Sequence, residues 1–405
     1  MSRGYADLPL HYGHIPPWLA QRMGLLGGAI VEAILADYGK AEVIRRFSDP
    51  FWFQALGCVL GMDWHSSGIT TSVMGALKRA VNPRSKELGI YICGGKGKHS
   101  KDTPRELLVM AEKTGLPGAD LVRSSKLVAK VDNTAIQDGF QLYLHCFLVS
   151  DEGDWSVVQQ GMNDASGMAR RYHWSSAALQ SYVDAPHTFI YGQNQGLILN
   201  LTDKDAASTR QGVLQLSKEN PVDLIQDIRH LKMPMHHDVR EKDVNLKRLG
   251  SVLALAQQQP VGDFESLLLL EGVGPRTLQS LTLVSEVIHG TPSRFADPAR
   301  FSFAHGGKDG HPFPVPVNVY DDTIHVLRQA LHKAKVGDSD KKDAIQQLSI
   351  LAQRIEKDFI PNDNFEQLLE KERAESYLHG GRTVFGKAEP HPQQQKQNGQ
   401  LSLFD

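Results

Sequence analysis

Four residues of the amino-terminal half are of the types that bind a divalent metal ion or activate water. Asp63 and His65 are two positions apart, so their side chains would share one face of an extended segment. Asp132 and His145 add a second carboxylate and a second imidazole. Carboxylate oxygens suit Mg²⁺ or Mn²⁺, and imidazole nitrogens also coordinate metals. We therefore predict a divalent metal site, with Mg²⁺ or Mn²⁺, from these four residues. The alternative for Asp63 and His65 is a hydrogen bond that fixes a turn.

A segment rich in glycine and lysine, residues 94–101, lies between a predicted strand and a predicted helix. Glycine allows close approach of a ligand to the backbone, and Lys96 and Lys98 near a helix N-terminus would stabilise phosphate groups. The spacing differs from that of a nucleotide-binding P-loop. The pattern therefore predicts contact with backbone phosphates and no nucleotide cofactor. A solvated basic loop is the alternative.

A third polar group follows the predicted strands. Arg170, Arg171 and His173 stand beside Trp174, a mixture that suits phosphate contact and base stacking, so we predict that these three bind DNA. Alternating polar residues at 141, 143 and 145 predict one polar strand face. Many metal-dependent nucleases carry Glu-x-Lys on the next strand, but Gln159 and Gln160 precede a glycine here.

The sequence Gly272-Val273-Gly274 joins two predicted helices, and Pro275 opens the second. Glycine allows the tight turn, Val273 can fill the space between the helices, and the second helix N-terminus with Arg276 favours an anion. The segment, with Thr277, resembles the helix-hairpin-helix of DNA repair proteins, which implies binding to the DNA backbone without sequence readout. An ordinary helical hairpin is the alternative.

The resemblance extends to the helix-hairpin-helix DNA glycosylases. Their lyase-active members have a lysine where this chain has Arg276, and an arginine cannot form a Schiff base. Asp297 lies near the place of their catalytic aspartate, so a monofunctional glycosylase is an alternative function. The three cysteines, Cys58, Cys93 and Cys146, are too few and too scattered for an iron–sulfur cluster.

The chain ends in Gln400-Leu401-Ser402-Leu403-Phe404-Asp405 after a polar stretch rich in glutamine. It resembles the short peptide with which bacterial replication and repair proteins bind the DNA sliding clamp, the polymerase III beta subunit. A disordered tether would deliver the two leucines and the phenylalanine into an apolar pocket. The alternative is a terminal strand or helix that packs back on the protein.

The elements that would position these groups predict an α+β protein. A mixed α/β domain covers residues 1–205, an all-helical helix-hairpin-helix domain covers 206–378, and a disordered tail covers 379–405. The best hairpin signal is two strand-like runs, 140–150 and 155–160, about a turn at 151–154. Thr103, Pro104 and Glu106 predict a helix that begins at Pro104 with a capping box.

Composition restricts the class of protein. The 405 residues carry 44 Lys and Arg against 46 Asp and Glu, so a uniformly basic coat for nucleic acid is excluded, although local basic patches are not. No apolar run approaches the ~20 residues that span a bilayer, and residues 1–10 have no secretory pattern. We expect a cytoplasmic, nucleoid-associated protein with no membrane partner.

Several further segments resemble a prokaryotic family described as a domain of unknown function, number 763. They are residues 61–68, 93–98, 157–163, 169–174 and 303–310. The resemblance covers most of residues 1–378 and implies no particular activity.

Together these patterns predict a bacterial genome-maintenance protein that binds DNA. The leading hypothesis is a structure-selective, metal-dependent nuclease recruited by the sliding clamp. Asp63, His65, Asp132 and His145 would then act as ligands or bases, and Lys96 and Lys98 would stabilise the phosphate. The alternatives are the glycosylase that uses Asp297 and a non-catalytic adaptor for DNA repair.

Overall fold

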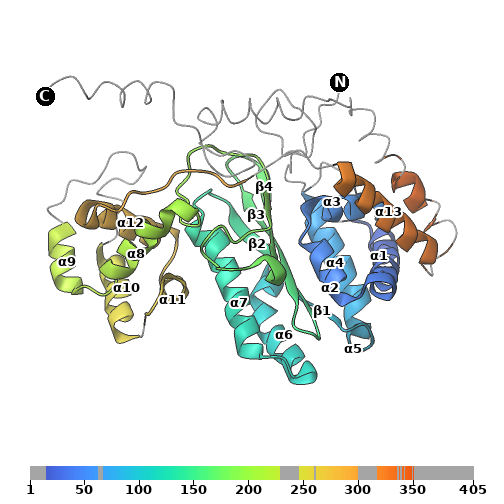
Figure 1. Cartoon of the computed structure of the whole chain (residues 1–405), viewed down its shortest axis with the longest axis horizontal. Helices are drawn as coiled ribbons and strands as arrows, with labels where there is room; N and C mark the ends of the chain where they lie inside the picture. Colours follow the sequence, from blue (N-terminus) through green and yellow to red (C-terminus); the bar gives the residue numbers. More distant parts are fainter. Residues whose placement is uncertain are drawn as a thin grey trace, which may run out of the picture.

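The structure, a computed structural model, describes residues 15–62, 67–228, 246–259, 261–299 and 317–334, with a few further positions up to 350 (Figure 1). Asp63 and His65 lie outside the described residues, as do the predicted tail and the clamp-binding motif from Gln400 to Phe404.

The described part combines helices with one antiparallel sheet, which confirms the α+β class. The strands are β1 (Ile90–Lys96), β2 (Gln141–Ser150), β3 (Trp155–Asn163), β4 (Met168–Ser175) and β5 (Phe189–Tyr191). The helices before the sheet are α1 (Pro17–Tyr38), α2 (Lys40–Phe47), α3 (Pro50–Val59), α4 (Gly68–Val81) and α5 (Ser85–Leu88). Between β1 and β2 stand α6 (Lys98–Thr114) and α7 (Gly118–Lys130). After the sheet come α8 (Ala207–Leu216), α9 (Pro221–Ile228), α10 (Leu246–Gln258), α11 (Phe264–Leu269), α12 (Pro275–His289) and α13 (Val317–Lys333).

The strands lie in the sheet in the order in which they occur along the chain, β1-β2-β3-β4-β5, and every neighbouring pair is antiparallel. Phe147 of β2 pairs with Val157 of β3, which pairs with Trp174 of β4. The predicted hairpin about residues 151–154 is therefore confirmed.

Helices cover both faces of this sheet (Figure 1). On one face, β2 residues Leu144 and Leu148 share a buried apolar cluster with α1 to α4 and α13. On the other face, Phe147 and Val149 share a second cluster with α6, α7 and the helices from α8 to α12. Polar side chains in the middle of the central strands, such as His145, Gln159 and Arg171, consequently lie in the interior, whichever face they occupy.

The helical second half joins the same cores. Leu253, Leu268 and Val284 belong to the cluster on the α7 side, and Leu327 of α13 belongs to the cluster on the α1 side. The predicted boundary between residues 205 and 206 stays a prediction. The helices that follow it pack on the core of the sheet.

Helix α6 begins earlier than the capping box predicts. It starts at Lys98 and contains Pro104, which has no backbone N–H to donate to Ser100 O. The Thr103 hydroxyl donates to Ser100 O instead, at 2.8 Å, so the carbonyl keeps a partner and the helix continues. The Glu106 carboxylate has partners other than the predicted capping box, since it accepts hydrogen bonds from Gly94 N and Lys78.

Helix α1 is long and apolar enough to cross a membrane by length and composition alone, which the sequence reading did not anticipate. Half of its most apolar window is buried inside the protein, and its residues Ile30, Val31 and Ile34 are part of the core. Core helices of soluble proteins pass the same test, so we assign α1 to the core.

Candidate functional site

The turn between α11 and α12 lies at the predicted glycines, although only Gly272 has a positive φ and Gly274 is extended, with a φ of −131°. Gly272 adopts a φ of +83°, in the left-handed region that favours glycine, and Val273 is 1% exposed. The α12 helix starts at Pro275 with Gly274 as its N-cap, and no side chain caps its first turn. Arg276 is exposed beside this turn. The structure therefore brings together the predicted hairpin residues.

Thr277 has an internal role. Its side chain is buried, and its hydroxyl donates to Gly272 O at 3.2 Å, which closes the hairpin across the turn. The prediction that Thr277 contacts DNA is therefore wrong for its side chain, because the hydroxyl serves the turn itself.

Two donors from the sheet layer hold the hairpin. Lys130, the last residue of α7, donates to Val273 O at 2.5 Å, and Gln137 donates to Pro275 O at 2.9 Å. Farther along α7, Arg123 pairs with Glu265 of α11 at 3.0 Å. The sequence does not predict these contacts, because local sequence patterns do not show which residues meet when they are more than 130 positions apart. The hairpin is thus attached to α7 at both its tip and its first helix.

The segment rich in glycine and lysine forms the end of β1 and the start of α6. Lys96 and Lys98 are exposed, and Gly97 between them has a φ of +62°. The Gly94 amide is not free for a phosphate, because it donates to the Glu106 carboxylate at 2.7 Å, and Lys78 bridges Glu106 and Gly94 O. Lysine side chains, rather than a glycine cradle, are what this loop offers to an anion. We call residues 96–101 the lysine loop.

The lysine loop and the hairpin contact the same short segment, residues 130–143, where α7 passes into β2. Gly97 N donates to Tyr143 O at 2.7 Å, and Gln137 holds the hairpin from the same segment. A π-helical turn, Val131–Ala135, precedes Gln137 in the same segment. Two separate basic elements therefore flank one end of the sheet.

Asp132 and His145 do not form a metal site with described residues. No group of three His, Cys, Asp or Glu side chains that could hold a metal ion occurs in the described ranges. The two residues are bridged by an amide: Gln159 donates to Asp132 Oδ2 at 2.5 Å, and its Oε1 lies 2.7 Å from His145 Nδ1. Trp174 and His187 also bond to Asp132. Asp132 therefore serves a buried hydrogen-bond network, which corrects its predicted role as a ligand or base.

The hydrogen-bond network determines which ring nitrogen of His145 carries the proton. Since the Gln159 amide nitrogen donates to Asp132 and to Val128 O, the Gln159 oxygen must accept from His145 Nδ1–H. His145 Nε2 then accepts from the Ser125 hydroxyl, 2.8 Å away. Burial lowers the pKa of His145 to about 4, against the opposite effect of the Gln159 bond. His145 is thus a neutral structural imidazole, and its predicted role as a ligand or base is wrong in this arrangement.

The polar strand face predicted for Gln141, Tyr143 and His145 is also wrong. The strand register shifts between Leu142 and Leu144, which breaks the alternation. Tyr143 packs with the α1 cluster, whereas His145 faces Ser125 of α7.

Neutral His145 makes stability depend on pH. The unfolded chain binds a proton near the ordinary histidine pKa of about 6.5, but the folded protein does so only near pH 4. Stability should therefore fall as the pH falls from about 6.5 to 4, by up to about 1.4 kcal/mol per pH unit from this residue. In urea unfolding across this range, His145→Gln should show a shallower fall than the unchanged protein. Equal slopes would contradict the assignment.

Arg170, Arg171 and His173 are fully buried, which corrects the prediction that they bind DNA. Arg171 Nε donates to His173 Nε2 at 2.9 Å, and its guanidinium lies over the rings of Phe53 and Tyr191. His173 Nδ1 lies 3.0 Å from Phe47 O, and burial holds its pKa well below the usual value. Because helices cover both sheet faces, charges on β4 are internal groups.

Asp297 is sealed as well. Its carboxylate pairs with Arg170 at 2.6 Å and accepts from the backbone amides of Gln195 and Ala299, each at 2.8 Å. Its side chain has no exposed surface. A catalytic aspartate must reach a substrate, so the glycosylase alternative has no support in this arrangement.

The family model described as "protein of unknown function (DUF763)" matches residues 4–315. The chain belongs to the DUF763 family. No curated protein and no solved structure matches it. The DUF763 match covers the whole sheet and the hairpin of α11 and α12, so both basic elements belong to one family unit.

Proposed function

We propose that this DUF763 protein binds DNA through the phosphate backbone and acts in genome maintenance. The observation that supports the proposal is the hairpin: a left-handed Gly272, a buried Val273 and an uncapped α12 N-terminus beside exposed Arg276. Such a terminus attracts anions through its amide groups and its dipole. Arg276 would add a charge-assisted hydrogen bond to a phosphate.

The lysine loop extends the proposed interface. Lys96 and Lys98 carry exposed charges near the start of α6 and, like the hairpin, adjoin residues 130–143. Neither element presents an arrangement for reading base edges, so binding should be independent of sequence. A protein of net charge −2 would then bind DNA through a local basic surface rather than through its overall charge.

Arg276→Glu should weaken binding to duplex DNA about tenfold or more in 0.1 M salt, equally for two unrelated sequences. The reason is the loss of a phosphate contact and the addition of a negative charge beside the hairpin. Fluorescence anisotropy at several salt concentrations measures this, and the salt dependence should become shallower by about one counterion.

Lys113→Glu is the matched control. Lys113 is exposed near the far end of α6, about 22 Å along the helix from Lys98. Its substitution should therefore leave the affinity for duplex DNA almost unchanged. Unchanged affinity in Arg276→Glu, or an equal loss in the control, would contradict the proposed interface.

Catalysis is a separate hypothesis. Because Asp132 and His145 are internal, metal-dependent hydrolysis of a phosphodiester would depend on Asp63 and His65, which lie outside the described residues. Lys96 and Lys98 would stabilise the phosphate charge. Incubation with branched and nicked DNA, with Mg²⁺ or Mn²⁺ and without metal, tests this. Binding without cleavage of any substrate would favour the adaptor, which the terminal motif would recruit to the sliding clamp.

A further inference from the structure

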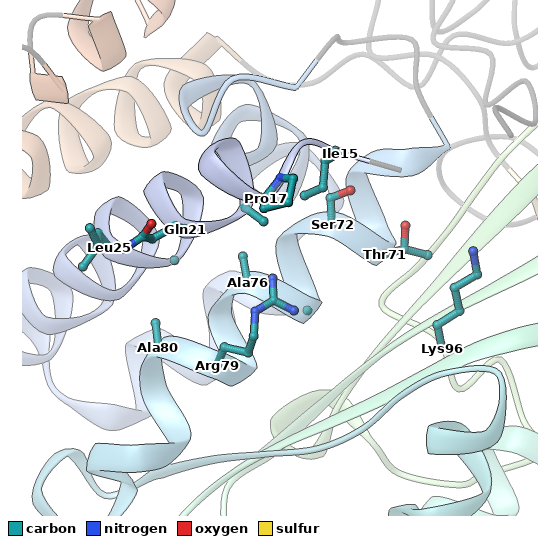
Figure 2. A pocket seen from close by; sticks show the side chains of 13 residues that line it. Ile15, Pro17, Gln21, Leu25, Thr71, Ser72, Ala76, Arg79, Ala80 and Lys96 are labelled. Carbon is teal, nitrogen blue, oxygen red and sulfur yellow. The ribbon is translucent and has the colours of Figure 1, made fainter. Parts of the chain in front are cut away.

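A groove of about 710 Å³ lies between α1 and α4, on the side of the sheet opposite α6 and α7 (Figure 2). Its floor consists of small residues, among them Gly24 of α1 and Gly75, Ala76 and Ala80 of α4. The two helices are packed closely here, since a Cβ on Gly24 would lie 3.5 Å from Ala76 O. The floor is therefore shallow and formed largely by backbone.

The groove is bordered by apolar side chains that the described residues leave uncovered. Leu25 lines it and is 58% exposed, and Trp18, one helical turn from the lining residue Gln21, is 60% exposed. Large apolar side chains gathered on one helix commonly mark a contact surface. The opposite side of α1 has no such surface, because α13 and the core cover it.

Among the described residues, two cations and no carboxylate line the groove. Arg79 and Lys96 are both exposed lining residues, and within the described part of the chain neither forms an ion pair. Figure 2 shows Lys96 near Thr71 at one end of α4 and Arg79 near Ala80 towards the other. Thr71, which marks the Lys96 end, and Arg79 are eight residues apart on α4, or about 12 Å along the helix axis. The groove is thus an apolar strip with positive charge at both ends.

We propose that this groove docks an amphipathic helix of another protein, which carries two acidic residues about two turns apart beside an apolar stripe. A floor of glycine and alanine lets a third helix approach closely, and interhelical packing of this kind buries an apolar face. The lining spans Pro17 to Leu25 on α1 and Thr71 to Ala80 on α4, or roughly 12–14 Å, which matches about two and a half turns of a partner helix.

A nucleic acid strand fits the groove less well. Strand-binding grooves combine several aromatic stacking platforms with many cations, whereas this groove has two lining cations and one aromatic ring, that of Trp18, at its border. Two cations would neutralise two carboxylates of a helix but few phosphates of a strand. The charge pattern therefore favours the acidic helix.

Selection from a displayed library of helical 14-residue peptides, with the full chain as bait, tests the proposal. Enriched peptides should carry an apolar stripe and two acidic residues seven or eight positions apart. Gly75→Leu should lower the affinity for these peptides at least tenfold by filling the groove. A Cβ at this position would lie 3.5 Å from the flexible Arg79 side chain and would meet no backbone atom. Arg79→Glu should weaken them to a similar extent.

Lys96 belongs both to this groove and to the proposed DNA interface, so the controls use residues that belong to only one of the two surfaces. Arg276→Glu and Lys113→Glu should leave peptide affinity unchanged, and Gly75→Leu should leave duplex affinity unchanged. No enrichment, peptides without acidic residues, or equal binding to Gly75→Leu would overturn the proposal. So would binding of a 20-nucleotide single strand that Gly75→Leu abolishes. If selected peptides bind only after residues 1–14 are removed, the chain's own terminus is the occupant, and the proposal fails.

Discussion

Arg170→Met should lower the free energy of unfolding by about 3–5 kcal/mol, the usual loss when one partner of a buried charge cluster is removed. Arg170 pairs with Asp138 at 2.8 Å and with Asp297 at 2.6 Å, and all three side chains are buried. Burial lowers the pKa of Arg170, but the two carboxylates raise it by more, so it stays charged. Without it, two carboxylates remain in the interior without a counter-ion. Urea unfolding at pH 7 measures the loss.

Arg171→Met is the matched control on the same strand. Arg171 is equally buried but has Gln54, His173 and aromatic rings as neighbours, and burial lowers its pKa to about 10. Removal of Arg171 leaves no buried carboxylate without a counter-ion. We therefore expect the free energy of unfolding to fall by about 1–2 kcal/mol, the contribution of a few hydrogen bonds. A loss equal to that of Arg170→Met would contradict the argument from stranded charge.

Gly94→Val should prevent folding or cost at least about 4 kcal/mol, a size that marks a specific steric conflict. Gly94 has a φ of +91°, and a Cβ there would lie 2.2 Å from His145 O and 2.5 Å from the Thr103 hydroxyl oxygen. His145 O cannot move aside, because it belongs to the strand paired with β1. Soluble yield and urea unfolding of the purified variant measure the effect.

Gly97→Val, three residues away, separates backbone strain from collision. Gly97 also has a positive φ, +62°, but a Cβ there would meet nothing within 4 Å. Only the backbone conformation is penalised: a φ of +62° with a ψ of −121° lies outside the left-handed helical region and costs a residue with a Cβ about 1–3 kcal/mol. Similar losses in the two variants would show that the contact with His145 O is not decisive.

The parts of the fold that sequence reasoning predicted are those with local signals. The Gly272–Gly274 turn and the strand pair about residues 151–154 both depend on residue types within a few positions. The helices α2 and α7 and the strand β4 were missed. Helix α7 buries Ser124 and Ser125 beside its leucines, so its polar residues obscure the apolar period. Strand β4 carries two buried arginines that read as surface charge.

The candidate site was harder to predict, because the same residue types serve catalysis and internal hydrogen bonding. Asp132 and His145 are residue types that suit a metal site, one shortly before a strand and one within it. Their true surroundings depend on α7, which supplies Ser125 and Val128 O from outside the sheet. Periodicity within a strand does not show that both of its faces are covered. The exposed charges that remain, Lys96, Lys98 and Arg276, stand on turns and helix starts.

The order of the strands bears on the kinetics of folding. β2, β3 and β4 are joined by turns of four residues, 151–154 and 164–167, so their pairing closes small loops and should occur early. The Arg170–Asp297 contact joins positions 127 residues apart and must await the arrival of the later helices. A contact made after the transition state changes the rate of unfolding more than that of folding. In a chevron plot, the loss caused by Arg170→Met should therefore fall mainly on the unfolding arm.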